Sequence, residues 1–321
     1  MVFIAVLIIA LVSLVLVWLA SLMIEALRQA PGSPDAMPWD PNLKPTYVAV
    51  QGVNLRYLRV GEGPTLVLLH TLRTQLDLFH KVIPELARDF TVYGLDLPGH
   101  GYSDIPDGPY DAEFFVGYVE GFLGELDLTD VILSGVSIGA SISLIIAARG
   151  NPRVARIVPI NPYDYDRGRG IARASWVGRV AVTLARVPVA GETFMRFRTQ
   201  FLIKTVLIGG VSRPSSINPR LMKEMYLVGN RPGHYRGFVR LLRNAASWER
   251  GRSGYGNIDV PALMVWGAED WACPDERRVD ESLVPGVHEV TVEGGGHFLP
   301  LDAPDDVVRH IRSVDVHRPR G

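Results

Sequence analysis

The residue whose type and setting point most directly to chemistry is Ser137, at the centre of a G-x-S-x-G pentapeptide that runs from Gly135 to Gly139. An apolar run that begins at Val131 precedes the pentapeptide, and small and apolar residues follow it, so the pattern predicts a strand, a tight turn and a helix. Glycines at both flanking positions leave room for a turn that exposes the serine Oγ and points helix N–H groups at the same place. Ser137 is therefore the candidate nucleophile.

A serine hydroxyl is a poor nucleophile until a base takes its proton, and the base needs a carboxylate that fixes its tautomer. Both residue types occur where predicted strands end. Asp270 follows a short apolar strand at 262–267, and His297 follows three glycines after an alternating segment at 288–293. Because parallel strands end at one edge of a sheet, the order Ser137, Asp270, His297 predicts a nucleophile, an acid and a base in one site.

Several segments of the chain resemble the α/β-hydrolase fold family, and the resemblance spans residues 47–315. They are the G-x-S-x-G pentapeptide, L-V-L-L-H ending at His70, D-L-P-G-H-G-Y-S-D beginning at Asp96, W-G-A-E-D ending at Asp270, and G-H-F-L-P-L around His297. The resemblance implies an α/β fold with a mostly parallel eight-stranded sheet, helices on both faces and a helical cap. It also implies a serine hydrolase mechanism in which Ser137 is the nucleophile, His297 is the general base and then acid, and Asp270 orients the histidine.

The resemblance leaves the acid and the cleaved bond open. Some members of this fold take the carboxylate from a position after the sixth strand, where Asp164 and Asp166 follow a predicted strand at 156–161, so both remain alternatives to Asp270.

Members that open epoxides or dehalogenate haloalkanes have an aspartate at the elbow, and Ser137 argues against both reactions. The expected reaction is hydrolysis of a lipophilic carboxylic ester, as in the membrane-anchored esterases and monoacylglycerol lipase-like members that the chain resembles. Acyl transfer to an alcohol, hydrolysis of a carbon–carbon bond and a catalytically silent binding role remain alternatives.

The loop after His70 departs from the family pattern. Family members commonly have glycine after this histidine, whereas Thr71 stands here, and a β-branched residue resists a positive φ. Either the loop turns in another way or the Thr71 hydroxyl joins the site. The N–H groups of Ile138 and Leu72 are the expected oxyanion donors. His70, Thr71 and Arg73 are possible substrate-binding residues, although a solvated loop position is the preferred interpretation of Arg73.

The start of the chain is strongly apolar. Val2 to Ile24 contain no charged residue and, as a helix, are long enough to cross a hydrocarbon core of about 30 Å. A secretory signal peptide is the competing interpretation, but the apolar stretch is long and no Lys or Arg precedes it. We therefore expect a transmembrane anchor over residues 1–27 and a Pro-rich tether over 28–46 that lies outside the core. A small excess of Lys and Arg after the span favours a catalytic domain on the cytoplasmic side of the membrane.

The remaining chain is expected to form one α/β core in two parts, residues 47–162 and 256–318, with a helical cap over 163–255 between them. The whole chain has 33 Lys and Arg against 34 Asp and Glu, but residues 164–252 alone hold 17 against 5. A basic and partly apolar cap on an anchored protein is expected to approach anionic lipid head groups. Solvated arginines on an ordinary cap are an equal alternative.

The sequence gives no sign of a metal or cofactor. It contains no ligand spacing such as H-E-x-x-H and no Walker-type loop, so none is expected. Cys273 is the only cysteine, which excludes an intrachain disulfide. Because no nucleic-acid-binding motif occurs either, the expected partners are a small-molecule or lipid ester substrate and a membrane.

Overall fold

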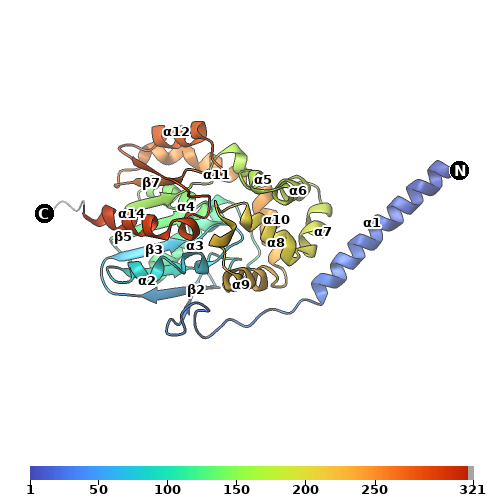
Figure 1. Cartoon of the computed structure of the whole chain (residues 1–321), viewed down its shortest axis with the longest axis horizontal. Helices are drawn as coiled ribbons and strands as arrows, with labels where there is room; N and C mark the ends of the chain where they lie inside the picture. The colour runs from blue at the N-terminus through green and yellow to red at the C-terminus, as the bar shows by residue number, and fades with distance from the viewer. Residues whose placement is uncertain (317–321) are drawn as a thin grey trace.

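The structure is a computed structural model that describes residues 1–316, with side chains described up to residue 314. The last two residues of the segment expected over 256–318 therefore lie outside the described residues. The predicted α/β fold is confirmed, with a mostly parallel eight-stranded sheet, helices on both faces and a helical cap (Figure 1). The strands are β1 Thr46–Val50, β2 Val53–Val60, β3 Thr65–Leu69, β4 Thr91–Leu95, β5 Val131–Val136, β6 Val154–Ile160, β7 Leu263–Gly267 and β8 His288–Val292.

The strand order is β1-β2-β4-β3-β5-β6-β7-β8. β2 runs antiparallel to both β1 and β4, and the other neighbours are parallel. All six residues of β5 are buried, as expected for a central strand that is covered on both faces. The carboxyl ends of β3, β5, β6 and β7 therefore meet at one edge, where the candidate site residues follow.

Helices cover both faces of this sheet. α3 and α4 pack on one face and α2 and α14 on the other (Figure 1). The elements of the core are η1 Leu76–Phe79, α2 Ile83–Leu86, α3 Ala112–Glu125, α4 Ile138–Ala148, α12 Pro274–Leu283, α13 Leu299–Asp302 and α14 Pro304–Val316. Between β6 and β7 the chain forms the cap, which consists of η2 Asp166–Gly168, α5 Ile171–Ala174, α6 Trp176–Ala185, α7 Ala190–Phe197, α8 Gln200–Ile208, η3 Pro214–Ser216, α9 Pro219–Gly229, α10 His234–Arg243, α11 Ala246–Gly251 and η4 Arg252–Asn257.

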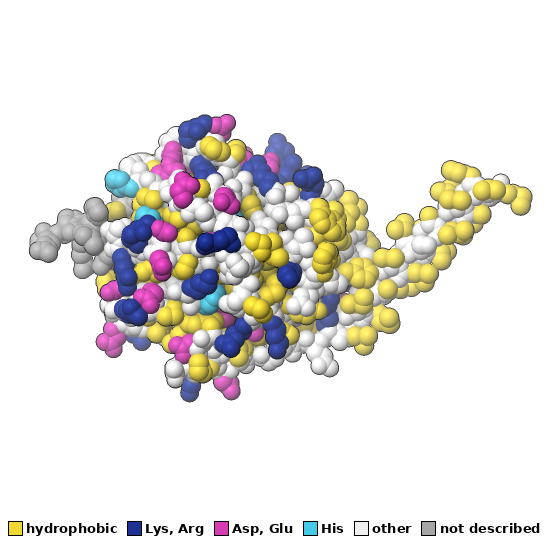
Figure 2. Space-filling view, in the orientation of Figure 1, with side chains coloured by type: hydrophobic (Ala, Val, Ile, Leu, Met, Phe, Trp, Pro, Cys, Tyr) yellow, Lys and Arg dark blue, Asp and Glu magenta, His cyan; other side chains and the backbone are white. Residues whose placement is uncertain are grey.

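The apolar N-terminal segment forms one helix, α1 Val2–Ala26, whose side chains are exposed along most of its length (Figure 2). Its length and composition suffice to cross a membrane, and a signal sequence near the N-terminus would have the same properties. The end of the helix is bound to the cap. Glu25 accepts hydrogen bonds from Arg198 Nη1 and from the Gly233 N–H, both at 2.8 Å, and Arg28 Nη2 donates to the Arg196 carbonyl at 2.8 Å.

The segment after α1 differs from the expected free tether. Met37 is only 2% exposed and belongs to the hydrophobic core, and Trp39 and Leu43 pack against that core. The Met37 sulfur lies 3.4 Å from Arg56 Nη2, so the flexible thioether fills space beside a buried guanidinium. The expectation that residues 28–46 lie wholly outside the core was therefore wrong for this part of the segment.

A buried carboxylate organises the turn after β4. Asp96 accepts hydrogen bonds from Arg56 Nη1 at 3.1 Å and from the N–H groups of Leu76 at 2.7 Å and Tyr102 at 3.0 Å. A Cβ on Gly101, at φ +51°, would lie 2.0 Å from the Asp96 carboxyl carbon, so the chain closes tightly around this group. The D-L-P-G-H-G-Y-S-D segment thus builds a turn and ties it to the loop that carries the expected oxyanion donor.

We predict that Asp96→Ala lowers the free energy of unfolding by about 3–5 kcal/mol, because it leaves the Arg56 guanidinium buried without its anion. Urea unfolding of detergent-solubilised protein, followed by circular dichroism, measures the change. Asp107→Ala is the control, since Asp107 is exposed and pairs with Arg240 on the surface. Equal unfolding midpoints for the two variants would contradict the role given to Asp96.

Candidate active site

Ser137 occupies the corner between β5 and α4. Its backbone has φ 60° and ψ −117°, a sparsely populated conformation for a residue with a side chain. The Ser137 N–H donates to the Ile160 carbonyl at 2.9 Å. A Cβ on Gly135 would lie 2.3 Å from the Gly139 carbonyl carbon, and one on Gly139 would lie 2.3 Å from the Leu69 carbonyl oxygen. The two glycines are therefore required for the close approach of strand, turn and helix.

His297 and Asp270 form a buried pair. His297 Nδ1 lies 2.5 Å from Asp270 Oδ1, and both side chains are fully buried. The second Asp270 oxygen accepts the Ala272 N–H at 2.9 Å. With the carboxylate as acceptor at Nδ1, that nitrogen carries the proton and Nε2 keeps its lone pair.

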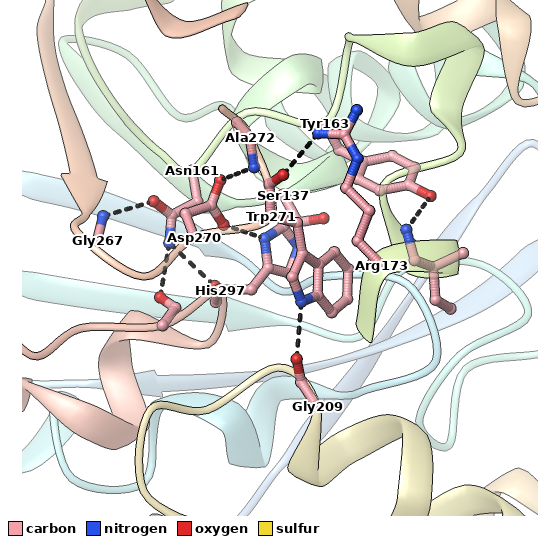
Figure 3. A network of polar contacts seen from close by, with 12 residues as sticks. Ser137, Asn161, Tyr163, Arg173, Gly209, Gly267, Asp270, Trp271, Ala272 and His297 are labelled. Atoms are coloured by element: carbon pink, nitrogen blue, oxygen red, sulfur yellow. Dashed lines mark hydrogen bonds and ion pairs between the residues drawn. The ribbon is translucent and has the colours of Figure 1, made fainter. Parts of the chain in front are cut away.

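The structure brings Ser137 into the same site as this pair (Figure 3). Ser137 Oγ and His297 Nε2 are both buried, and neither has a hydrogen-bond partner within residues 1–316. A hydrogen bond between the two atoms is therefore not formed in this state. Such bonds are often long in ligand-free sites and tighten when a substrate binds.

The alternative acids lie elsewhere. Asp164 accepts hydrogen bonds from the Tyr255 hydroxyl at 2.6 Å and from Arg252 Nη2 at 3.2 Å. Asp166 lies 3.4 Å from Arg173 on the cap. Of the three candidate carboxylates, the structure thus brings only Asp270 to His297.

Asn161, which the sequence reasoning did not single out, joins the loops that carry His297 and Asp270. Its Nδ2 donates to the carbonyls of Gly296 at 3.0 Å and His297 at 3.1 Å, and its Oδ1 accepts the Gly267 N–H at 2.8 Å (Figure 3). The available signal was its position at the carboxyl end of β6, where a polar residue faces the neighbouring loops.

Trp271 is the second residue that the sequence reasoning missed. Its ring stacks on the His297 ring with centroids 3.7 Å apart and planes 12° apart. Its Nε1 donates to the Gly209 carbonyl of the cap at 2.8 Å (Figure 3). The indole therefore covers one face of the imidazole and links it to the cap. Its place next to Asp270 was the only sequence signal.

The cap is also bonded directly to the histidine loop. Asp302 Oδ2 accepts the N–H groups of Ser212 at 2.8 Å and Gly296 at 3.0 Å, and the Phe298 N–H donates to the Gly210 carbonyl at 2.7 Å. The segment between α8 and α9 thus closes over the site, and Ser137 is fully buried beneath the cap.

The loop after β3 turns at Arg73, whose φ is 62°, and not at Thr71. The β-branched Thr71 therefore does not have to adopt the positive φ that it would resist. Thr71 is buried and its hydroxyl has no partner in the described part of the chain, so it remains a candidate site group. The N–H groups of Leu72 and Ile138, the expected oxyanion donors, likewise form no hydrogen bond among the described residues.

His70 is engaged by the protein itself. Its Nε2 accepts the Leu97 N–H at 3.0 Å, and its Nδ1 donates to the Thr71 carbonyl at 2.7 Å. Burial lowers the pKa of His70 to about 4, so the ring is neutral at physiological pH. Since both ring nitrogens form hydrogen bonds within the protein, His70 stabilises the loop and has no free nitrogen for a substrate.

Arg73 lies under the cap and is not a solvated loop residue, which corrects the preferred interpretation of its sequence position. Its Nη1 is 3.3 Å from His234 Nδ1, and its guanidinium lies 5.0 Å from the centre of the Phe238 ring.

No group of three or more His, Cys, Asp or Glu residues in the described chain is arranged to hold a metal ion, and Cys273 is free and exposed.

The fold and this site agree with a comparison of the sequence with protein families. Residues 64–304 match the model of the alpha/beta hydrolase fold family. The chain belongs to this family. Two relatives are an uncharacterized protein of Mycobacterium tuberculosis, 25% identical over 83% of this chain and 78% of that protein, and bifunctional epoxide hydrolase 2 of Mus musculus, 26% identical over 87% and 57%. This α/β hydrolase thus spans little more than half of the mouse enzyme.

A further relative is the (E)-2-((N-methylformamido)methylene)succinate hydrolase of Acinetobacter baylyi, 23% identical over 78% of this chain and 90% of that enzyme. Solved structures with the same fold include a haloalkane dehalogenase variant from Bradyrhizobium elkanii, with a TM-score of 0.74 and 18% identity, covering 85% of this chain and 98% of that one. The enol-lactonase from Burkholderia xenovorans has a TM-score of 0.67 and 22% identity, with 85% and 100% covered. These relatives carry the names of several kinds of hydrolase, so they do not support the finer resemblance to monoacylglycerol lipases.

The buried state of His70 predicts a pH dependence of stability. An unfolded imidazole binds a proton near pH 6.5, whereas folded His70 stays neutral down to about pH 4. Between these values the unfolded chain binds more protons, so this residue makes the protein less stable as the pH falls. We expect the free energy of unfolding of the parent to fall more steeply from pH 7 to pH 4.5 than that of His70→Gln. Parallel curves from urea unfolding at each pH would contradict the assignment.

Proposed function

We propose that this α/β hydrolase is a membrane-anchored serine hydrolase that cleaves a carboxylic ester with a lipophilic portion. The observation that carries the proposal is the free Nε2 of a buried imidazole, whose other nitrogen is bonded to a buried carboxylate, in the same site as the unpartnered Ser137 hydroxyl. A serine at the elbow forms an acyl-enzyme with an ester. Epoxide opening or dehalogenation through a covalent ester would need a carboxylate nucleophile at this position, and Ser137 does not supply one.

In this mechanism Ser137 Oγ attacks the carbonyl carbon and its proton passes to His297 Nε2. The imidazolium gives this proton to the alcohol oxygen as the ester C–O bond breaks, which leaves the acyl group on the serine. A water molecule then loses a proton to the same nitrogen and attacks the acyl carbon. The imidazolium returns this proton to Ser137 Oγ as the acyl–serine bond breaks, which releases the carboxylic acid and free serine. Asp270 holds the Nδ1 proton, and the N–H groups of Leu72 and Ile138 are the proposed donors to the developing oxyanion.

We predict that a fluorescent fluorophosphonate labels the solubilised parent protein and does not label Ser137→Ala. This probe phosphorylates a serine only where a base and oxyanion donors activate it, and loss of the nucleophile lowers kcat by about 10⁴ or more. Ser141→Ala is the matched control, because Ser141 is buried one helical turn away and bonds to the Tyr163 N–H. Absence of labelling in folded parent protein would favour the silent binding role. Methanol or glycerol esters among the products would favour acyl transfer.

Apolar side chains on the cap support a position against a lipid bilayer. Trp176, Val187, Val189 and Phe201 are exposed, and they lie on or beside α6, α7 and α8. α1 packs on α7, and α6, α7 and α8 lie at the end of the molecule from which α1 extends (Figure 1). Exposed apolar side chains beside a membrane-length helix are typical of a protein that rests on the membrane interface. The excess of basic residues in the cap would add attraction to anionic head groups.

Site-directed spin labelling in lipid nanodiscs tests this position. Phe201→Cys and Val279→Cys are made separately with Cys273→Ser, so that each protein has one thiol. Phe201 is 64% exposed on the cap, whereas Val279 is 42% exposed on α12, away from α1 (Figure 1). We expect the label at 201 to be more accessible to oxygen than to a water-soluble nickel chelate, and the label at 279 to show the reverse. Equal aqueous exposure would contradict the interfacial cap, and an intact mass that lacks α1 would identify a signal peptide.

A further inference from the structure

An apolar cavity lies between the cap and the loop after β3. Its walls are aliphatic and aromatic side chains of α5 to α8 and α10, together with two arginines, Arg73 and Arg198. Two of its lining residues connect it to the candidate active site. Arg73 follows Leu72, the proposed oxyanion donor. The N–H of Ile171 donates to the Tyr163 hydroxyl at 3.1 Å, and the Tyr163 ring lies 6.1 Å from the His297 ring.

The two arginines of the cavity differ in how they are neutralised. Arg198 forms an ion pair with Glu25 at 2.8 Å and donates to the Gly229 carbonyl at 2.8 Å. Arg73 has no carboxylate partner in the described part of the chain. Its one hydrogen bond there is the 3.3 Å contact with His234 Nδ1, although a guanidinium carries five N–H donors. His234 cannot neutralise it, because an imidazole is either neutral or cationic, and burial keeps this one neutral by lowering the pKa of His234 well below its usual value.

Two contributions that lower the stability of the folded protein are therefore found at Arg73. An unpaired cation in an apolar, partly dehydrated cavity is destabilising unless an anion joins it. Burial, together with repulsion from Arg198 and Arg28, lowers the pKa of Arg73 to about 9, so it still carries its charge at neutral pH. Its backbone also has φ 62°, a left-handed conformation that costs an arginine more than a glycine. Strain and an unpaired charge at one residue of the loop that packs on the nucleophile turn are typical of a ligand-binding position.

We propose that Arg73 binds an anionic oxygen group of the substrate, so that the enzyme selects amphiphiles with one carboxylate or phosphate and an apolar chain that lies in the cap cavity. The hydrolysis of such a substrate rests on the proposed function, whereas the binding of its anionic group by Arg73 does not. The planar guanidinium can donate hydrogen bonds to two oxygens of a carboxylate or phosphate at once. Its attraction to such an anion is stronger where water is excluded. The apolar walls would hold the chain, and the arginine would fix its direction relative to Ser137.

Isothermal titration of full-length Ser137→Ala protein in a nonionic detergent tests the binding without any turnover. The probes are octanoate, octyl phosphate and the uncharged octanamide, which share the same chain. We expect the protein to bind octanoate or octyl phosphate at least tenfold more tightly than octanamide, and the preference to weaken with added salt. The anion that binds more tightly shows whether Arg73 prefers a carboxylate or a phosphate. Arg73→Gln should abolish the preference, Arg73→Lys should keep part of it, and Arg179→Gln, at an exposed position on α6, should leave it unchanged.

Equal binding of the anions and octanamide, or a preference that survives in a folded Arg73→Gln protein, would overturn the proposal and leave Arg73 as a structural donor to His234. Turnover supplies the second readout. With the p-nitrophenyl half-ester of suberic acid, Arg73→Gln should raise KM at least tenfold and change kcat less than threefold, whereas p-nitrophenyl octanoate should be unaffected. Anion binding through Arg73 without turnover of either ester would contradict the proposed ester hydrolysis and leave this inference intact.

Discussion

The close approach of backbone around Ser137 is the constraint on which the site depends. The serine is held in a sparsely populated backbone conformation with positive φ between the central strand β5 and helix α4, and neither Gly135 nor Gly139 has space for a side chain. Gly139 packs against the end of β3, so the nucleophile turn and the neighbouring Leu72 loop are fixed relative to each other. A single steric condition thus sets where the hydroxyl lies and where the two free N–H groups beside it lie.

The other half of the site is assembled from loops that follow three different strands. Asn161 after β6 holds the β7 and β8 ends together through one amide, and Asp270 then orients His297. Trp271 stacks on His297 and donates to the Gly209 carbonyl of the cap, and Asp302 accepts N–H groups from Ser212 of the cap and from Gly296. The histidine loop is therefore bound to both the core and the cap. Any movement that admits a substrate to the buried serine must therefore preserve these contacts or change the position of the base.

The N-terminal helix is more than a flexible attachment. Glu25 and Arg28 at its end bind cap residues, and Glu25 neutralises Arg198 at the wall of the apolar cavity. The same cavity contains Arg73, whose charge has no such partner. The N-terminal helix, the cap and the loop beside the nucleophile thus meet at one set of basic residues, and the excess positive charge of residues 164–252 is partly directed inward.

The sequence by itself determined the strand–turn–helix around Ser137, the alternation of strands and helices and the membrane-length apolar helix, because each depends on residues close together in the chain. It also predicted Asp270 and His297 at strand ends, with Asp164 and Asp166 left as alternatives to Asp270. Only the tertiary structure decided that choice, since it depends on which loops meet across the sheet edge. It also placed Met37 in the core, occupied both nitrogens of His70 and turned Arg73 into the cavity. These features arise from contacts between segments far apart in sequence, where burial and the partner groups, and not the local pattern, fix the role of a side chain.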